Sequence, residues 1–250
     1  MQTSFKRRLS HGDVLVGTIV TLPSPEMVEI FCSAGFDWLF VDLEHGALGV
    51  REAQVLLQAA GEQVPCLVRV PSIDEVWIKR ALDIGAAGII APNVRSAEAA
   101  RKVVRLCKYP PEGSRSVGIA RAQGYGERFQ ESVATANEAV AVIIQIEHVD
   151  AVAAIEEIIA VAGIDAVFVG PYDLSASMHK MGLTTDPAVQ NAIRKVWQST
   201  RAARIPIGIF GPTAESVKPY IQNGYTLIVV GTDTLMLVSA AKDITSALKR

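Results

Sequence analysis

The chain of 250 residues contains no long apolar run and few cysteines. No stretch approaches the ~20 consecutive apolar residues that a membrane-spanning helix needs. The basic start at residues 1–8 is not followed by the apolar run of a secretory signal. The three cysteines, Cys32, Cys66 and Cys107, are odd in number and widely spaced, which fits neither a disulfide framework nor a Cys-based zinc site. We therefore expect a cytoplasmic protein with reduced, mostly buried thiols and no membrane partner.

An excess of either charge is also missing. The formal net charge is -2 at pH 7 and the isoelectric point is about 6.1, so there is no general electrostatic case for a nucleic-acid partner. Linker-like tracts rich in glycine, serine or proline are absent, and 50% of the residues are hydrophobic. We predict a single domain over residues 1–250 with one large core.

Short apolar runs alternate with amphipathic stretches along the whole chain. Most of the runs lack strict alternation, which is typical of parallel strands buried on both faces. Eight such alternations favour a closed (β/α)8 barrel, the TIM barrel of the α/β class, over an open sheet. Strands are predicted at 14–20, 38–42, 66–70, 88–92, 140–146, 166–169, 205–209 and 226–230, and helices at 26–34, 50–60, 73–84, 97–108, 151–161, 188–203, 214–223 and 234–249.

Capping residues support these boundaries. Pro25 suits the first turn of a helix capped by Ser24. Further N-caps are predicted at Ser72, Ser96 and Thr213, and helix-ending glycines at Gly35, Gly61, Gly85 and Gly224.

One segment breaks the rhythm. Residues 109–125, YPPEGSRSVGIARAQGY, are too long and too rich in Pro, Gly and Arg for a plain connection. Long ordered loops in compact domains are often functional. We expect this loop either to pass over the barrel mouth or to contact another subunit.

Polar, chemically capable residues close four of the predicted strands. The motifs are VDLEH at 41–45, VR at 68–69, QIE at 145–147 and GPYD at 170–173. The carboxyl ends of barrel strands lie on one face, where such barrels perform catalysis. The pattern therefore predicts an enzyme.

The carboxylates of Glu147 and Asp173 are candidates for a metal site. Gln145 and Glu147 are two residues apart, so on a strand both point toward the barrel mouth. A hard cation such as Mg²⁺ or Mn²⁺ would satisfy the two carboxylates and leave positions for water or substrate. A structural salt bridge to a neighbouring Arg or Lys is the alternative.

His45 is the candidate acid–base residue because histidine exchanges protons near neutral pH. Asp42, Glu44 or the more distant Asp83 would hold one ring nitrogen and raise its basicity. A lone histidine at a strand end is also commonly a hydrogen-bonded structural group.

Arg69 stands inside an apolar strand and therefore needs an anion. A carboxylate or enolate oxygen of a substrate would fit its planar fork, and pairing with Glu44 or Glu147 is the structural alternative. The turn at 170–173 can expose backbone N–H groups to a bound anion.

Lysine is absent from every predicted strand and strand end. A Schiff-base mechanism needs a desolvated lysine at such a position, so this class of mechanism is not expected.

The same residues carry a family resemblance. The segments AGFDWLFVDLEH at 34–45, QIE at 145–147 and VFVGPYDLS at 167–175 resemble the HpcH/HpaI aldolases. The stretches 65–71, 81–85 and 109–113 support this resemblance, which covers nearly the whole chain. It implies a metal-dependent class II pyruvate aldolase acting on 2-keto-3-deoxy sugar acids and related 4-hydroxy-2-oxo acids.

The resemblance also implies a role for each motif residue. The metal ligands for Mg²⁺, Mn²⁺ or Co²⁺ would be Glu147 and Asp173, and His45 would be the base. It further assigns base activation to Asp83, transition-state stabilisation to Arg69, and pyruvate binding to Gln145 and the backbone around Tyr172 and Asp173.

Two features depart from the family pattern. Tyr172 replaces a small residue expected in some members, and the loop 113–125 differs from the sugar-acid aldolases. These departures leave the aldehyde partner of pyruvate open. Family members assemble as hexamers, so a homo-oligomer is expected, with the apolar stretch 235–248 as a candidate contact. The alternative function is a related lyase acting on an acyl-CoA or another oxo acid.

Overall fold

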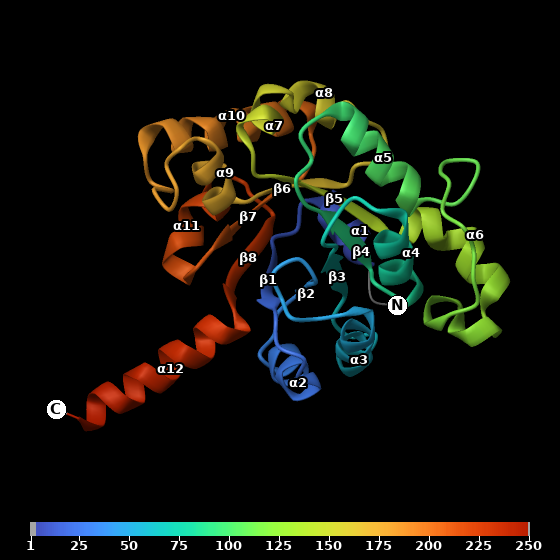
Figure 1. Ribbon diagram of the computed structural model, residues 1–250, viewed down its shortest axis with the longest axis horizontal. Helices are drawn as coiled ribbons and strands as arrows, with labels where there is room; N and C mark the ends of the chain where they lie inside the picture. Colours follow the sequence, from blue (N-terminus) through green and yellow to red (C-terminus); the bar gives the residue numbers. More distant parts are fainter. Residues whose placement is uncertain (1–3, 250) are drawn as a thin grey trace.

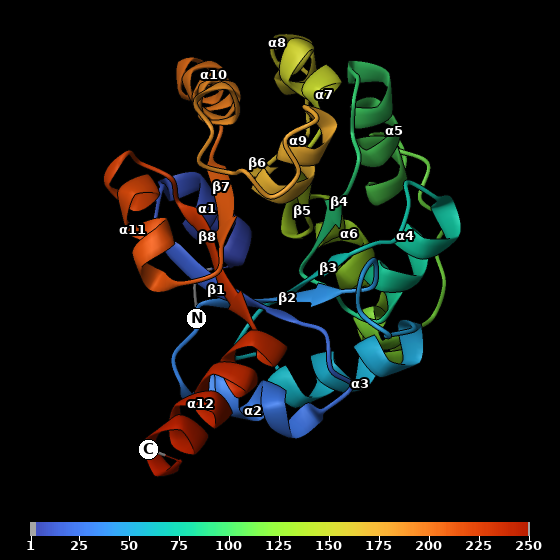
Figure 2. The same cartoon turned by 60° about the vertical axis from the view of Figure 1, so that its left-hand side comes forward.

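The computed structural model describes residues 4–249 as a closed barrel of parallel strands surrounded by helices (Figures 1 and 2). Each strand pairs with the next along the chain, and the last pairs with the first. The predicted (β/α)8 barrel is therefore confirmed. The strands are β1 (Leu15–Val20), β2 (Trp38–Asp42), β3 (Cys66–Arg69), β4 (Gly88–Ala91), β5 (Ala141–Ile146), β6 (Ala166–Val169), β7 (Ile207–Gly211) and β8 (Leu227–Thr232).

Helices follow the strands, and most of them pack around the barrel. The first eight comprise α1 (Phe5–His11), α2 (Pro25–Ser33), α3 (Val50–Ala60), α4 (Glu75–Asp83), α5 (Ala97–Cys107), α6 (Phe129–Ala139), α7 (Val149–Ala153) and α8 (Ile155–Ile159). The remaining elements are α9 (Pro171–Ser177), α10 (Pro187–Ala203), α11 (Ala214–Gln222), α12 (Asp233–Leu248) and a 3-10 helix, η1 (Arg121–Gly126). Within residues 4–249, no helix is both long and apolar enough to cross a membrane.

The barrel interior is filled by alternate residues of the strands. Trp38 and Phe40 of β2 and Phe168 of β6 belong to this inner cluster. Gly17 of β1 faces them because a Cβ at this position would lie 2.6 Å from the Trp38 ring. Side chains pointing the other way pack under the outer helices.

Helix α1 closes the amino-terminal end of the barrel. Its residues Phe5 and Leu9 join the inner cluster, and the Phe5 ring lies 5.8 Å from that of Trp38. An ion pair between Arg8 and Asp37, 2.7 Å apart, ties the helix to the start of β2. The sequence analysis did not predict this helix, because its short length and its basic residues give little amphipathic signal.

Most of the predicted caps are confirmed. The side chains of Ser24, Ser96 and Thr213 each accept a backbone N–H in the first turn of the helix that follows. The cap predicted at Ser72 is wrong. Helix α4 begins two residues later, where the Asp74 carboxylate accepts the N–H of Val76.

The long segment after α5 lies beside the amino ends of the strands and does not cover the mouth. Arg115 pairs with Asp83 at the end of α4, and Arg121 donates hydrogen bonds to the carbonyls of Leu57 and Ile84. These contacts anchor the segment to the carboxyl ends of α3 and α4. The expectation of a loop over the mouth is therefore wrong, whereas a subunit contact stays a prediction.

Helix α12 projects away from the barrel (Figures 1 and 2). Its first residue, Asp233, is fully buried and accepts hydrogen bonds from the backbone of Thr21 and Leu22. Beyond this anchor no side chain of the helix is buried. Large apolar side chains are exposed instead, at Leu235, Leu237, Val238, Ile244 and Leu248.

Because Leu9 is 1% exposed against the inner cluster, Leu9→Ala should lower the free energy of unfolding by ~2–4 kcal/mol. Urea denaturation would measure this loss. Leu183→Ala, at a leucine that is 58% exposed, is the matched control and should change stability by less than ~0.5 kcal/mol. Equal stabilities for the two variants would show that α1 does not seal the barrel.

Candidate functional site

The inward-facing positions of the strands are apolar inside the barrel and become polar at the carboxyl ends of β2 and β3. In β2 the inward positions run from Trp38 through Phe40 to Asp42. In β3 the inward Leu67 is followed two residues later by Arg69. Asp42 and Arg69 are register partners at the carboxyl ends of their strands. A two-residue repeat thus places a buried acid beside a buried base.

Arg69 and Asp42 form a bidentate pair. The Arg69 Nε lies 2.8 Å from Asp42 Oδ1, and Nη2 lies 2.7 Å from Oδ2. Burial by itself raises the pKa of Asp42, but the hydrogen bonds and charge of Arg69 lower it below its ordinary value. The guanidinium also lies 5.1 Å from the centre of the Phe40 ring. Both groups are therefore held charged and in a fixed orientation.

The same carboxylate organises the loop that carries His45. Asp42 Oδ1 accepts the backbone N–H groups of Glu44, at 3.0 Å, and of His45, at 3.3 Å. The His45 side chain is 66% exposed at the mouth, and its Nε2 lies 3.9 Å from Glu44 Oε2. Of the carboxylates expected to hold the ring, Glu44 is the one near it in this chain.

Glu44 connects the histidine to the rest of the site. Its Oε2 lies 3.2 Å from Arg69 Nε, so the structural pairing of Arg69 with Glu44 exists alongside the pair with Asp42. Burial raises the pKa of Glu44, the positive charge of Arg69 opposes this shift, and the negative charge of Glu147 adds to it. The charges of Glu44 and Glu147 therefore act on each other.

Glu147 is buried just beyond the end of β5. Its Oε1 accepts the backbone N–H of Asn93, at 2.6 Å, and its Oε2 accepts a short hydrogen bond from the Gln145 amide. Burial raises the pKa of Glu147, and the charge of Asp173 raises it further. The predicted carboxylate pair is thus close in space, with Glu147 enclosed and Asp173 exposed in the first turn of α9.

The groups around Glu147 include oxygen atoms of the kind that bind a small cation. The side-chain amide oxygen of Gln145, Oε1, is buried without a hydrogen-bond partner among residues 4–249. Gly170 borders these groups, because a Cβ there would lie 3.2 Å from Glu147 Oε2 and from the Gln145 amide nitrogen. An unpartnered oxygen beside two carboxylates is a donor set suited to a hard divalent cation.

Tyr172 lies at the rim of this site. It is 55% exposed in the first turn of α9, next to Asp173, and its carbonyl accepts the Ser175 hydroxyl. The mouth thus brings together six of the predicted residues: His45, Arg69, Gln145, Glu147, Tyr172 and Asp173.

Asp83 is not brought to His45 within this chain. Helix α4 runs back from the mouth, so its last residue, Asp83, lies near the amino ends of the strands. There its carboxylate pairs with Arg115 at 2.8 Å. The sequence analysis joined Asp83 to His45 both as a possible partner of the ring and through the role that the resemblance assigns, and neither argument took account of the direction in which the helix crosses the barrel.

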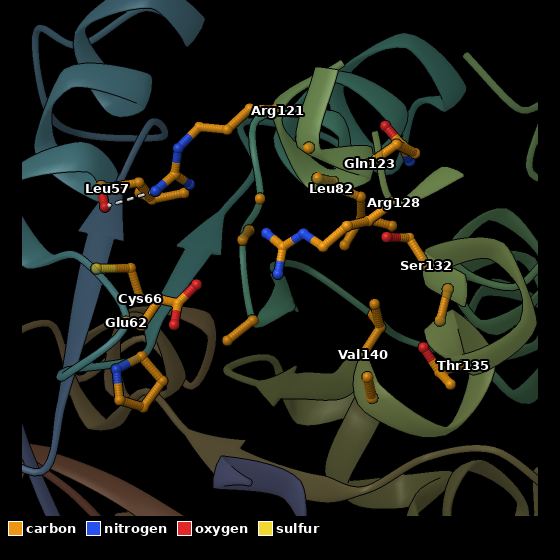
Figure 3. A pocket seen from close by; sticks show the side chains of 18 of the residues that line it. Leu57, Glu62, Cys66, Leu82, Arg121, Gln123, Arg128, Ser132, Thr135 and Val140 are labelled. Carbon is orange, nitrogen blue, oxygen red and sulfur yellow. Dashed lines mark hydrogen bonds between the residues drawn. The ribbon is translucent and has the colours of Figure 1, made fainter. Parts of the chain in front are cut away.

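A large cavity is also at this far end. It has a volume of about 850 Å³ and lies between the amino ends of β3–β5 and the segment formed by η1 and α6. Figure 3 shows the guanidinium groups of Arg121 and Arg128 and the carboxylate of Glu62 around it. Burial raises the pKa of the Cys66 thiol at its wall to about 12, which disfavours the reactive thiolate.

Asn93 is the site residue that sequence reasoning missed. It follows β4, adopts a left-handed backbone conformation with a φ of 58°, and directs its N–H at Glu147. The available signal was the Pro92-Asn93 pair after a strand, because asparagine tolerates this conformation better than most residues.

Comparisons with known proteins identify the family of the chain. The family model for HpcH/HpaI aldolase/citrate lyase matches residues 16–240. A 4-hydroxy-2-oxovalerate aldolase of Rhodococcus jostii is 39% identical over 94% of this chain and 91% of its own length. A 2-dehydro-3,6-dideoxy-6-sulfogluconate aldolase of Pseudomonas putida is 40% identical over 94% of this chain and 92% of its own.

A solved structure extends the likeness to the fold. The crystal structure of an HpcH/HpaI aldolase/citrate lyase family protein from Burkholderia cenocepacia superposes with a TM-score of 0.94 and 34% identity, covering 98% of each chain. The matches of sequence and of barrel lead to one conclusion: the chain belongs to the HpcH/HpaI aldolase/citrate lyase family.

Proposed function

We propose that the protein is a metal-dependent pyruvate aldolase, a carbon–carbon lyase that cleaves 4-hydroxy-2-oxo acids to pyruvate and an aldehyde. The observation that carries the proposal is the convergence of Arg69, Gln145 and Glu147 with Asp173 and His45 at one barrel mouth. Relatives at 39% and 40% identity are aldolases, which supports this reaction class.

Glu147 and Asp173 would hold a divalent cation, Mg²⁺, Mn²⁺ or Co²⁺. Among residues 4–249 no three His, Cys, Asp or Glu side chains form a ready metal cluster, so the chain offers few ligands. That small set suits a hard cation that keeps several other ligands. When bound, the cation supplies positive charge where the enolate oxygen develops negative charge.

The remaining roles follow from the contacts of each side chain. Arg69, oriented by Asp42, offers its guanidinium to the same developing charge. Gln145 and the backbone at Tyr172 and Asp173 would orient pyruvate. His45, exposed at the mouth, would take the proton from the 4-hydroxyl group as the carbon–carbon bond breaks.

The alternative is a related lyase acting on an acyl-CoA or another oxo acid. A basic cluster at the mouth would favour a CoA phosphate, and Arg115 and Arg121 were the sequence candidates. In this chain both arginines contact the carboxyl ends of α3 and α4, far from the mouth. No observation therefore favours the acyl-CoA reading over the aldolase.

An assembly of identical chains is the proposed working form, a hexamer by family resemblance. The exposed apolar side chains of α12 form a surface that another protein chain could bury. A second copy of this chain is the partner we propose. The role that resemblance assigns to Asp83 also requires assembly. Because Asp83 and His45 lie at opposite ends of one barrel, the partner subunit's Asp83 would have to reach His45.

The metal hypothesis predicts that losing a metal ligand and losing the acid–base residue impair different steps. EDTA should abolish aldol activity, and Glu147→Ala should lose tight metal binding, aldol activity and exchange of the pyruvate methyl protons together. His45→Ala should keep metal and pyruvate binding while aldol cleavage falls by ~10²–10⁴-fold. Metal titration, proton exchange and aldol assays on each variant would measure this. Full activity in chelator, with a pyruvate adduct trapped on a lysine by borohydride, would overturn the proposal.

Arg69→Lys should lower turnover by ~10²-fold or more although the positive charge is kept. A lysine ammonium cannot donate to both Asp42 oxygens and to substrate in the geometry of the planar fork. Steady-state kinetics of the aldol reaction would test this, with Arg194→Lys on the exposed face of α10 as control. Near-native turnover in Arg69→Lys would make the arginine a structural residue.

The assembly hypothesis predicts complementation between two inactive variants. His45→Ala and Asp83→Asn should each be inactive alone, whereas a mixed assembly should recover ~25% of wild-type activity, since about a quarter of its sites pair two intact groups. Co-expression with two affinity tags would isolate the mixed assembly, and size-exclusion chromatography would show its size. Activity of Asp83→Asn alone, or no recovery in a mixed assembly of native size, would contradict contact between subunits.

A further inference from the structure

The loop after β4 links the proposed metal ligand Glu147 to an arginine at the rim. Asn93 donates its backbone N–H to Glu147 Oε1, at 2.6 Å, and its side-chain oxygen accepts the Nε–H of Arg95, at 2.9 Å. With its positive φ, Asn93 directs its backbone N–H at Glu147 and its side-chain oxygen at Arg95. Arg95 is therefore held in place by the same short loop that holds a site carboxylate.

The Arg95 guanidinium makes no other hydrogen bond or ion pair within the described part of the chain. Among residues 4–249 no carboxylate oxygen comes within 4.0 Å of it, although an arginine carries five N–H donors. With Nε bound to Asn93, the two Nη groups remain available as a planar fork. This geometry fits a carboxylate, which accepts two parallel N–H bonds.

Arg95 lines a cavity that opens beside the reacting groups. The cavity has a volume of about 320 Å³, lies between the carboxyl ends of β2, β3 and β4, and is also lined by Glu44, Ser72 and Asn93. Glu44 is the connection to the site, since its Oε2 lies 3.2 Å from Arg69 Nε. A substrate group that extends from Arg69 past Glu44 would enter the cavity next to Arg95.

The length of this path matches a short chain. Two hydrogen bonds and the Asn93 side chain separate Glu147 Oε1 from Arg95 Nε, so the two atoms are at most ~10 Å apart. A six- or seven-carbon acid, about 6–8 Å long when extended, spans most of that distance. The second end of such a substrate would reach the fork of Arg95.

Charge gives the cavity its selectivity. Asp42, Glu44, Glu147 and Asp173 crowd the mouth with negative charge, and Arg69 is already engaged by two of them. An anionic end group would be repelled there unless a separate cation received it. Arg95 is that cation at the rim of the cavity.

We propose that Arg95 is a specificity-determining residue that binds a terminal carboxylate on the aldehyde half of the substrate. The physiological substrate class is then the 4-hydroxy-2-oxo acids that carry a second carboxylate at the far end. This inference rests on the proposed aldolase function and specifies the aldehyde that the reaction releases or consumes.

The test compares two aldehydes of nearly equal shape, succinate semialdehyde and its methyl ester, each condensed with pyruvate in the presence of Mn²⁺. Wild-type enzyme should prefer the acid. Arg95→Gln should lower kcat/KM for the acid by ~10–100-fold and leave kcat/KM for the ester unchanged. Arg95→Lys should lose less, because it keeps the charge without the fork. Added salt should narrow the wild-type preference, because the guanidinium is exposed.

Two controls separate recognition from a structural role. Arg101→Gln, at an exposed arginine of α5, should leave kcat/KM unchanged for both aldehydes. Metal affinity and the KM for pyruvate should be unchanged in Arg95→Gln, since these report on Glu147. An equal loss with both aldehydes, or weakened metal binding, would mean that Arg95 only supports Asn93 and would overturn the inference.

The outcomes also distinguish this inference from the function beneath it. A wild-type enzyme that joins pyruvate to both aldehydes without preference, and an Arg95→Gln variant that behaves like it, would overturn the role of Arg95 alone. A wild-type enzyme that forms no carbon–carbon product from either aldehyde would overturn the aldolase function itself.

Discussion

The bidentate pair between Arg69 and Asp42 is the interaction on which the mouth of the barrel depends. It joins the ends of β2 and β3, and the same Asp42 carboxylate holds the backbone of the loop that carries Glu44 and His45. Removing one partner of a buried pair typically costs about 3–5 kcal/mol, because the other charge is left uncompensated. The orientation of Arg69 and the position of His45 therefore depend on the same carboxylate, that of Asp42.

Around that pair, carboxylates outnumber the positively charged side chains at the mouth. Burial raises the pKa of both Glu44 and Glu147, and each also feels the charge of a neighbouring carboxylate. Such an arrangement is unfavourable in an empty site and favourable with a cation between the oxygens. The cost in the unliganded protein is the electrostatic reason for expecting metal binding there.

The closed barrel also separates two groups of polar residues to opposite ends of the molecule. Strands deliver their last residues to the mouth, whereas the outer helices run back and deliver theirs to the opposite end. Asp83 and the segment anchored by Arg115 and Arg121 therefore gather at the amino-terminal side. Any cooperation of these groups with His45 has to come from the contact of one chain with another.

The sequence by itself determined the barrel, because buried parallel strands and capped amphipathic helices alternate in a pattern that few folds satisfy. It also determined that Arg69, Gln145 and Glu147 share a face, since strand side chains repeat every two residues. Tertiary structure alone decided that Arg69 pairs with Asp42, that Asn93 supports Glu147 and that Asp83 lies far from His45. Those relations depend on strand register and on the direction of helices across the closed sheet, which local periodicity does not encode.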